Sequence, residues 1–219
     1  MSPPGAAAPG ANAAARYPVP VPGAEDPHCT ELVVRRSRFL AQCARATGSD
    51  AARAFVDAIR RRHPDATHNC WAFIAGPPGD GGAAGYSDDG EPHGTAGRPM
   101  LQVLLHGGIG EIAVVVSRWF GGTKLGTGGL ARAYQDAVQA NLASLEVRER
   151  VETLRLDAVV DYADADGLHR LLPRHEARIV ETRCLDRMTL TLEMPLSEAE
   201  PFAAALAGVT GGRGAVLGA

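Results

Sequence analysis

Residues 111–130, EIAVVVSRWFGGTKLGTGGL, decide the fold that we expect. Their first nine residues are strongly apolar, which predicts a strand covered on both faces in the middle of a sheet. Five glycines follow within residues 121–129 and predict a turn. An apolar stripe at helical spacing then predicts a helix over residues 128–142. A central strand that leads through a glycine-rich turn into a helix is typical of an α/β domain.

The segments before this stretch extend the same domain. Apolar residues at strand or helix spacing predict three strands and two helices there. The strands are expected over residues 30–36, 37–44 and 67–75, and the helices over residues 49–62 and 95–106. Ser49 is expected to cap the first helix, and Pro64 to follow its end.

Two further segments before residue 111 are expected to lack regular structure. Residues 1–25 are rich in Pro, Ala and Gly and offer little apolar surface to bury, so we expect a disordered tail. Residues 76–85 form a glycine-rich loop.

The C-terminal part has a different order of predicted strands and helices. We expect a strand over residues 153–161 and a helix over 164–172 that ends at Pro173. A hairpin should follow, with strands over residues 176–183 and 187–194. A helix with an N-cap over residues 197–207 and a short strand over 214–217 complete this part. The order β-α-β-β-α-β is the ferredoxin-like pattern. A boundary near residues 148–153 therefore separates a domain at 28–148 from a domain at 151–219.

Composition bounds the function. The formal net charge is −3, which excludes a protein that holds nucleic acid by bulk positive charge. Residues 29–150 carry 14 basic and 12 acidic side chains, whereas residues 151–219 carry 7 and 11. A polyanion would therefore meet the first domain rather than the second.

Cysteine usage and hydropathy point to a cytoplasmic protein that does not enter a membrane. The four cysteines form no C-x-x-C pair, so neither a zinc ribbon nor a disulfide framework is expected. No apolar run reaches the length of a membrane span. The N-terminus has no basic region followed by an apolar core, so a signal peptide is not expected.

The first polar cluster is YSDDGEPHGTAGRP at residues 86–99. Three carboxylates, Asp88, Asp89 and Glu91, together with His93, could hold a cation or a substrate. The same residues are also typical of a turn, and Gly94-Thr95 of a helix cap. The spacing is not that of an EF-hand, and we predict no metal site.

The second polar cluster is RWFGGTKLGTGGL at residues 118–130. Its glycines allow a ligand to approach the backbone, and the helix that follows offers free N–H groups to an anion. A P-loop is excluded by the spacing, and a dinucleotide site lacks the second parallel strand. A tight connection between sheet and helix is the structural alternative. The candidate polyanion or RNA site comprises Arg118, Trp119, Phe120, Gly121, Gly122, Lys124, Gly126 and Gly129.

A third cluster, HNCWAF at residues 68–73, lies on a predicted strand. His68 and Cys70 share one face of that strand, so a nucleophile and base are conceivable. A buried cysteine, however, is more often a small apolar residue. The second polar loop of the candidate site is accordingly taken as His68, Asp88, Asp89, Glu91 and Thr95.

These clusters, in this order, resemble the IMPACT/YigZ family. The matching stretches are SRFLA at 37–41, HNC at 68–70, SDDGEP at 87–92, GTAG at 94–97 with Pro99, RWFGGTKLG at 118–126 and GGL at 128–130. The resemblance covers roughly residues 28–145. Trp119 stands where many members have tyrosine.

The resemblance implies an α+β protein. Its first domain would have the ribosomal protein S5 domain 2-like fold, and its second would be a ferredoxin-like α/β plait. Similar folds occur together in elongation factor G, in the part that reaches tRNA and the ribosome, and eukaryotic members regulate translation.

The resulting function prediction is a translation-associated regulator that binds RNA, the ribosome or a translation factor, with no cofactor. The alternative is an enzyme that acts on a small phosphorylated or acidic substrate with the two glycine-rich loops. The resemblance supplies no catalytic residues, and a protein without enzymatic activity is favoured.

Overall fold

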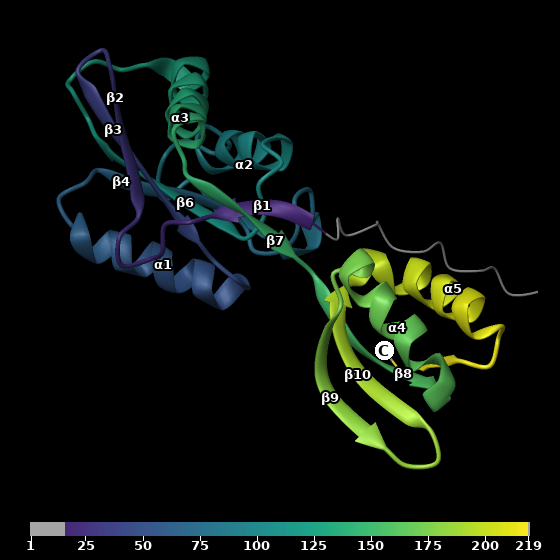
Figure 1. Ribbon diagram of the computed structural model, residues 1–219. Coiled ribbons are helices and arrows are strands. Elements are labelled where there is room, and N and C mark those ends of the chain that lie inside the picture. The colour runs from purple at the N-terminus through teal and green to yellow at the C-terminus, as the bar shows by residue number, and fades with distance from the viewer. Residues whose placement is uncertain (1–15, 219) are drawn as a thin grey trace, which may run out of the picture. The chain divides into compact units, whose positions relative to one another are not determined.

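The computed structural model describes residues 16–218 of the chain (Figure 1). The chain divides into two compact units, and the division falls between Arg150 and Val151. An α+β architecture is confirmed, with helices on a mostly antiparallel sheet in each unit. No helix within the described residues is both long enough and apolar enough to cross a membrane.

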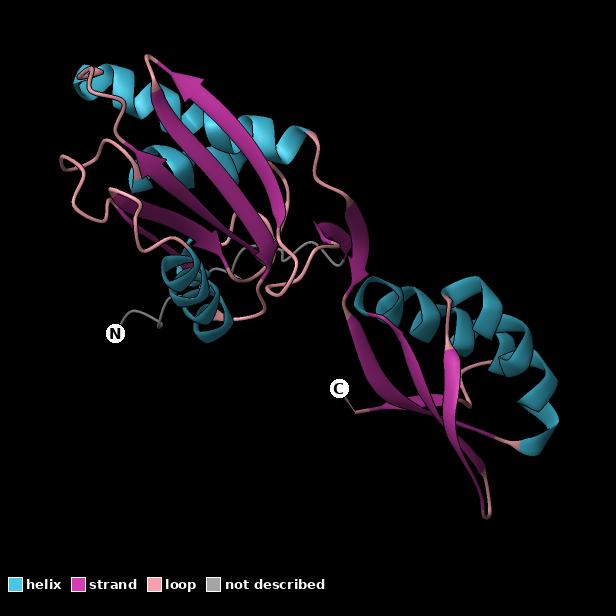
Figure 2. Cartoon of the chain, turned by 90° about the vertical axis from the view of Figure 1, so that its left-hand side faces the viewer, coloured by secondary structure: helices cyan, strands magenta, loops and turns pink. Residues whose placement is uncertain are grey.

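A five-stranded antiparallel sheet forms the centre of the first unit (Figure 2). Its strands are β2 (His28–Val34), β3 (Ser37–Arg45), β4 (His68–Ile74), β5 (Ala84–Ser87) and β6 (Ile112–Trp119). They lie in the order β2-β3-β6-β4-β5, so β6 is central, as its continuous apolar sequence predicts.

Helices cover both faces of this sheet. The helices α2 (Gly97–His106) and α3 (Gly126–Ala143) pack on one face, and α1 (Ser49–Arg62) packs on the other. Successive residues of β6 point to opposite faces, so Val114 and Val116 meet α2 and α3 while Ala113 and Val115 meet α1. This alternation decides which residues at the end of β6 can share a site.

The glycine-rich turn after β6 lets α3 begin close to the β2–β3 hairpin. A Cβ on Gly121 would lie 2.0 Å from the carbonyl carbon of Arg36, so only glycine fits there. Gly126 opens α3 with a φ of +73°. The helix therefore begins two residues earlier than the apolar stripe predicts, because Gly126, Thr127, Gly128 and Gly129 form its first turn.

The expectation of a disordered tail over residues 1–25 is wrong for residues 16–20. Arg16–Pro20 form β1, which pairs with β7 (Val147–Val151) in a two-stranded sheet. Tyr17 and Val19 are buried. Residues 1–15 lie outside the described part of the chain.

A charged cluster joins β1 to the rest of the first unit. Glu111 accepts a hydrogen bond from the Tyr17 hydroxyl at 3.2 Å and pairs with Arg45 at 2.7 Å. Arg150 pairs with Glu111 and donates to the Tyr17 hydroxyl at 2.9 Å. Burial, as the main cause, raises the pKa of Tyr17. The cluster therefore links four segments of the sequence through one buried carboxylate.

The second unit has the ferredoxin-like order that its sequence predicts. Its strands are β8 (Thr153–Val160), β9 (Arg178–Cys184), β10 (Met188–Pro195) and β11 (Ala215–Leu217), in the order β11-β8-β10-β9. The helices α4 (Ala165–Leu171) and α5 (Ala199–Thr210) bury the core of this unit against one face of the sheet.

Three local predictions need correction. Ser49 begins α1 but makes no capping hydrogen bond, and Gly48 occupies the N-cap position. The loop at residues 76–85 contains a 3-10 turn at Gly81–Ala83 and the first residues of β5, because β5 pairs with the edge of β4. Pro173 does not stop the chain's helical course, because it lies within the 3-10 turn Leu172–His175 that continues α4.

Candidate functional site

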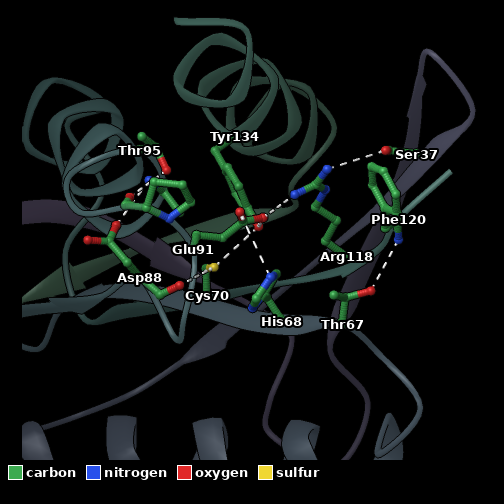
Figure 3. Close-up of polar contacts among 12 residues, drawn as sticks. Ser37, Thr67, His68, Cys70, Asp88, Glu91, Thr95, Arg118, Phe120 and Tyr134 are labelled. Carbon is green, nitrogen blue, oxygen red and sulfur yellow. Dashed lines mark hydrogen bonds and ion pairs between the residues drawn. The ribbon is translucent and has the colours of Figure 1, made fainter. Parts of the chain in front are cut away.

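The candidate site is a cavity of about 430 Å³ where β6 ends and α3 begins. It brings together residues from both polar clusters of the sequence (Figure 3). Its lining includes His68, Glu91, Arg118, Phe120, Lys124 and Gly126. A larger hollow of about 640 Å³ lies between α2 and α3, but none of its lining residues is Asp, Glu, Lys or Arg. The charged groups thus select the first cavity.

A buried ion pair between Arg118 and Glu91 crosses this cavity. The Nη1 atom of Arg118 lies 2.5 Å from Oε1 of Glu91, and both side chains are more than nine-tenths buried. The Tyr134 hydroxyl donates to the same Oε1 at 2.9 Å. Arg118 also donates to Ser37 Oγ at 3.4 Å. The charge of Arg118 is therefore neutralised inside the protein, and it is not a free cation for a polyanion.

His68 stands opposite Glu91 on β4 (Figure 3). Its Nδ1 atom lies 2.9 Å from the carbonyl oxygen of Asp89, which can only accept, so Nδ1 carries a hydrogen. In the neutral ring Nε2 is then an acceptor. Nε2 lies 3.9 Å from Oε2 of Glu91, and both atoms belong to residues that line the cavity.

Asp88 caps the N-terminus of α2 instead of facing the cavity. Its carboxylate accepts hydrogen bonds from the backbone N–H groups of Gly94, Ala96 and Gly97 at 2.8 to 3.0 Å. Burial disfavours its charge, but these three hydrogen bonds outweigh burial and hold the pKa of Asp88 below its ordinary value. The helix cap that was predicted at Gly94-Thr95 is therefore supplied by Asp88, which lies several residues earlier in the sequence.

Asp89 and Thr95 also have structural partners. Asp89 pairs with Arg60 at 2.6 Å and accepts from the backbone N–H of Asn69 at 2.7 Å. The Thr95 hydroxyl donates to the Pro92 carbonyl at 2.6 Å. No cluster of three or more potential His, Cys, Asp or Glu ligands occurs between residues 16 and 218. Of the predicted second loop, only His68 and Glu91 line the cavity.

Cys70 does not have the surroundings of a nucleophile. It is fully buried, and its thiol lies 2.9 Å from the Asp88 carbonyl oxygen and 3.2 Å from the Tyr134 hydroxyl. Burial raises the pKa of the Cys70 thiol far above its ordinary value, so the thiol is protonated at neutral pH. The apolar interpretation of Cys70 fits this environment.

The two aromatic candidates lie apart. Trp119 points to the α1 side of the sheet, where its Nε1–H donates to Asp65 at 2.9 Å and Arg38 lies 4.5 Å from its ring centre. Phe120 lines the cavity, and 49% of its surface is exposed. Of the two, only Phe120 can stack on a ligand in this cavity.

The glycines of the second cluster shape the turn. Gly121 is packed against the β2–β3 hairpin, Gly122 has a φ of +84°, and Gly129 lies in the N-terminal part of α3. Gly126 lines the cavity, where its absent side chain leaves the start of α3 open.

Sequence reasoning missed three cations beside this turn. Arg35 and Arg36 form the tip of the β2–β3 hairpin, with φ values of 45° and 66°, and Arg132 lies on α3. With Lys124 they make a set of exposed cations, here called the basic edge: Arg35, Arg36, Lys124 and Arg132. Arg35 and Arg132 line one hollow with Leu125, the neighbour of Lys124. The available signal was the position of Arg35-Arg36 at the end of the predicted strand 30–36, directly before the next predicted strand.

None of the four cations of the basic edge has an ion-pair partner within 4.0 Å among the residues that the structure describes. Arg60 on α1 is by contrast paired with Asp89. The basic edge is therefore a group of cations beside the cavity whose positive charge is available to an anion.

Comparison with known proteins gives two family matches. Residues 35–142 match the family described as the Impact N-terminal domain. Residues 159–213 match a family described only as a domain of unknown function.

Curated relatives match most of the chain. The Escherichia coli protein described as "IMPACT family member YigZ" is 39% identical over 80% of this chain and 85% of its own length. An "IMPACT family member" of Haemophilus influenzae is 38% identical over 84% of this chain and 89% of its own. A solved structure described as that of a hypothetical protein matches with a TM-score of 0.64 and 35% identity, and covers 93% of this chain and 97% of that one.

Proposed function

We propose, from the premise that this chain belongs to the IMPACT family, that it is a translation-associated protein that binds RNA through the basic edge of its first unit. The observation that carries this proposal is the set of four exposed, unpaired cations around the start of α3. Phosphate groups are the ligands that such a set attracts.

Local charge is needed because the whole chain has a net charge of −3. A sequence of this balance does not hold RNA by its overall field. The hairpin tip, the glycine-rich turn and α3 bring together cations that are about 90 residues or more apart in the sequence, namely Arg35 and Lys124 or Arg132. Three or four phosphate contacts correspond to a slope of log affinity against log salt of about −2 to −3 for a single strand.

The proposal is tested by binding of a short single-stranded RNA and by co-sedimentation with ribosomes, each at low and high salt. The double variant Arg35→Ala/Lys124→Ala should bind RNA at least ten times more weakly, with a salt slope shallower by about 1.4. The control is Arg53→Ala/Arg61→Ala on α1, which removes the same charge from exposed positions on the other face of the sheet. Equal loss in both variants, or no binding by the wild type, would overturn the proposal.

A second candidate is an enzyme for a small phosphorylated or acidic substrate. Its support is the presence of His68 and Glu91 in one cavity, where a base and a carboxylate face each other. Nucleotides, sugar phosphates and divalent cations should then raise the melting temperature of the protein. No shift with any of these ligands would reject this candidate.

A further inference from the structure

We propose that the cavity beside the basic edge receives a nucleobase that carries an exocyclic amino group. This inference rests on the proposed function, since it names the part of an RNA that the site would read. It also separates the roles of the two features: the basic edge takes phosphates, and the cavity takes a base.

Two hydrogen-bond acceptors lie close together in the cavity, Oε2 of Glu91 and Nε2 of His68. Oε1 of Glu91 accepts from both Arg118 and Tyr134. Oε2 of the same carboxylate receives no hydrogen bond from any residue in the described part of the chain, although the side chain is 97% buried. Its nearest polar neighbour is Nε2 of His68, 3.9 Å away. A carboxylate oxygen with this unused capacity can accept an N–H from a ligand in the cavity.

The chemistry of these acceptors selects an amino group. A nitrogen with two N–H bonds can lie within about 2.9 Å of both acceptors at once and donate to each of them. A phosphate or a carbonyl group cannot, because each would bring an acceptor against the Glu91 carboxylate. The inner end of the cavity therefore rejects the anion that the adjacent cations attract.

The walls fit a flat ring attached to that amino group. Phe120, Leu125 and Leu130 line the cavity, and Phe120 is half exposed at its rim. Unpaired bases stack on such aromatic faces. The volume of about 430 Å³ lies in the range of small-ligand sites. Cytosine, adenine and guanine carry the required amino group, whereas uracil does not.

The mouth of the cavity fits the phosphate next to the base. Lys124 is exposed there, and Gly126 and Thr127 begin α3, whose first N–H groups have no intrahelical partner. A base inserted toward Glu91 would therefore keep its own phosphate beside cations.

The test uses eight-nucleotide RNAs of cytidine or uridine at equal salt, read by fluorescence anisotropy. The wild type should bind the cytidine oligomer about ten times more tightly, or better. His68→Asn retains an N–H for the Asp89 carbonyl but removes the Nε2 atom that reaches toward Glu91, and should reduce this ratio to near one. Lys124→Ala should weaken both RNAs equally and leave the ratio unchanged.

A cytidine oligomer whose bases lack only the amino group separates this interaction from ring shape, and it needs no variant. It should bind the wild type like the uridine oligomer. If it binds like cytidine, or if wild type binds cytidine and uridine equally, the amino-group inference is overturned and RNA binding stands. If the wild type binds none of the RNAs, the proposed function fails and the inference fails with it.

Discussion

Arg118 and Glu91 lie on separate segments of the chain, yet their side chains form a buried pair with 2.5 Å between Nη1 and Oε1. The pair joins the end of the central strand to the loop before α2. It also means that Arg118, a cation of the glycine-rich motif, is paired inside the protein and is not free to bind an anion. The consequences for mutagenesis are direct.

Removal of either partner should destabilise the first unit strongly, because the other charge is left buried. We expect Arg118→Ala to lower the free energy of unfolding by about 3–5 kcal/mol. The exposed Lys124→Ala should change it by less than about 0.5 kcal/mol. Both tryptophans, Trp71 and Trp119, lie in the first unit, so urea unfolding followed by tryptophan fluorescence reports on this unit. An unaltered midpoint for Arg118→Ala would show that the pair does not contribute.

The carboxylate of Asp88 should make the free energy of unfolding depend on pH in the acid range. Because the folded-state pKa of Asp88 is lowered, its charged form stabilises the protein above the unfolded-state pKa of about 3.9, and this contribution is lost as pH falls through the folded pKa. Asp88→Asn should therefore cost about 1–3 kcal/mol at pH 7 and progressively less below about pH 4. Asp136→Asn, at an exposed position on α3, is the control. A cost for Asp88→Asn that persists unchanged to pH 2 would contradict this account.

The four cysteines should fall into two classes in the native protein. Cys29 and Cys184 are exposed, whereas Cys43 and Cys70 are buried. Burial raises the pKa of Cys43 to about 12 and that of Cys70 still further, so neither forms a thiolate at neutral pH. A maleimide reagent should label two thiols in the native protein and all four after denaturation, counted by mass spectrometry. Labelling of Cys70 in the native state would revive its role as a nucleophile.

The two adjacent aromatic residues should differ in their effect on RNA binding. Phe120→Ala should weaken binding by about five- to one-hundred-fold, as expected for one stacked base. Trp119→Ala should leave the affinity unchanged, because Trp119 lies on the other face of the sheet with Asp65 and Arg38. Anisotropy with the same RNA compares them, after circular dichroism has shown that each variant is folded. A larger effect from Trp119 would place the RNA on the α1 face.

The sequence predicted the fold where periodicity was strong. The continuous apolar run of β6 marked the central strand, and the strand and helix order of residues 153–217 predicted the ferredoxin-like sheet order. Strand alternation also separates Arg118 from Trp119, although the candidate site combined them. The pairing of Arg118 with Glu91 was not predictable, because it depends on how β6, α3 and the loop before α2 converge.

The small sheet formed by β1 and β7 could not be predicted from the composition of its two strands. Its first strand lies in a Pro/Ala/Gly-rich segment, and its second, VRERV, reads as an exposed charged linker. The weak signal was the alternation of Tyr17 and Val19, which are both buried.

The β1–β7 pair also sets the limits of any useful fragment. The match to the Impact N-terminal domain covers residues 35–142, but β1 and β7 lie outside it on either side. An expression fragment cut to the family match would lose both strands and also β2, together with Tyr17 and Arg150, and would leave the buried Glu111 with Arg45 alone. Such a fragment should be poorly soluble, whereas one that runs from residue 16 through residue 151 retains both ends of the fold.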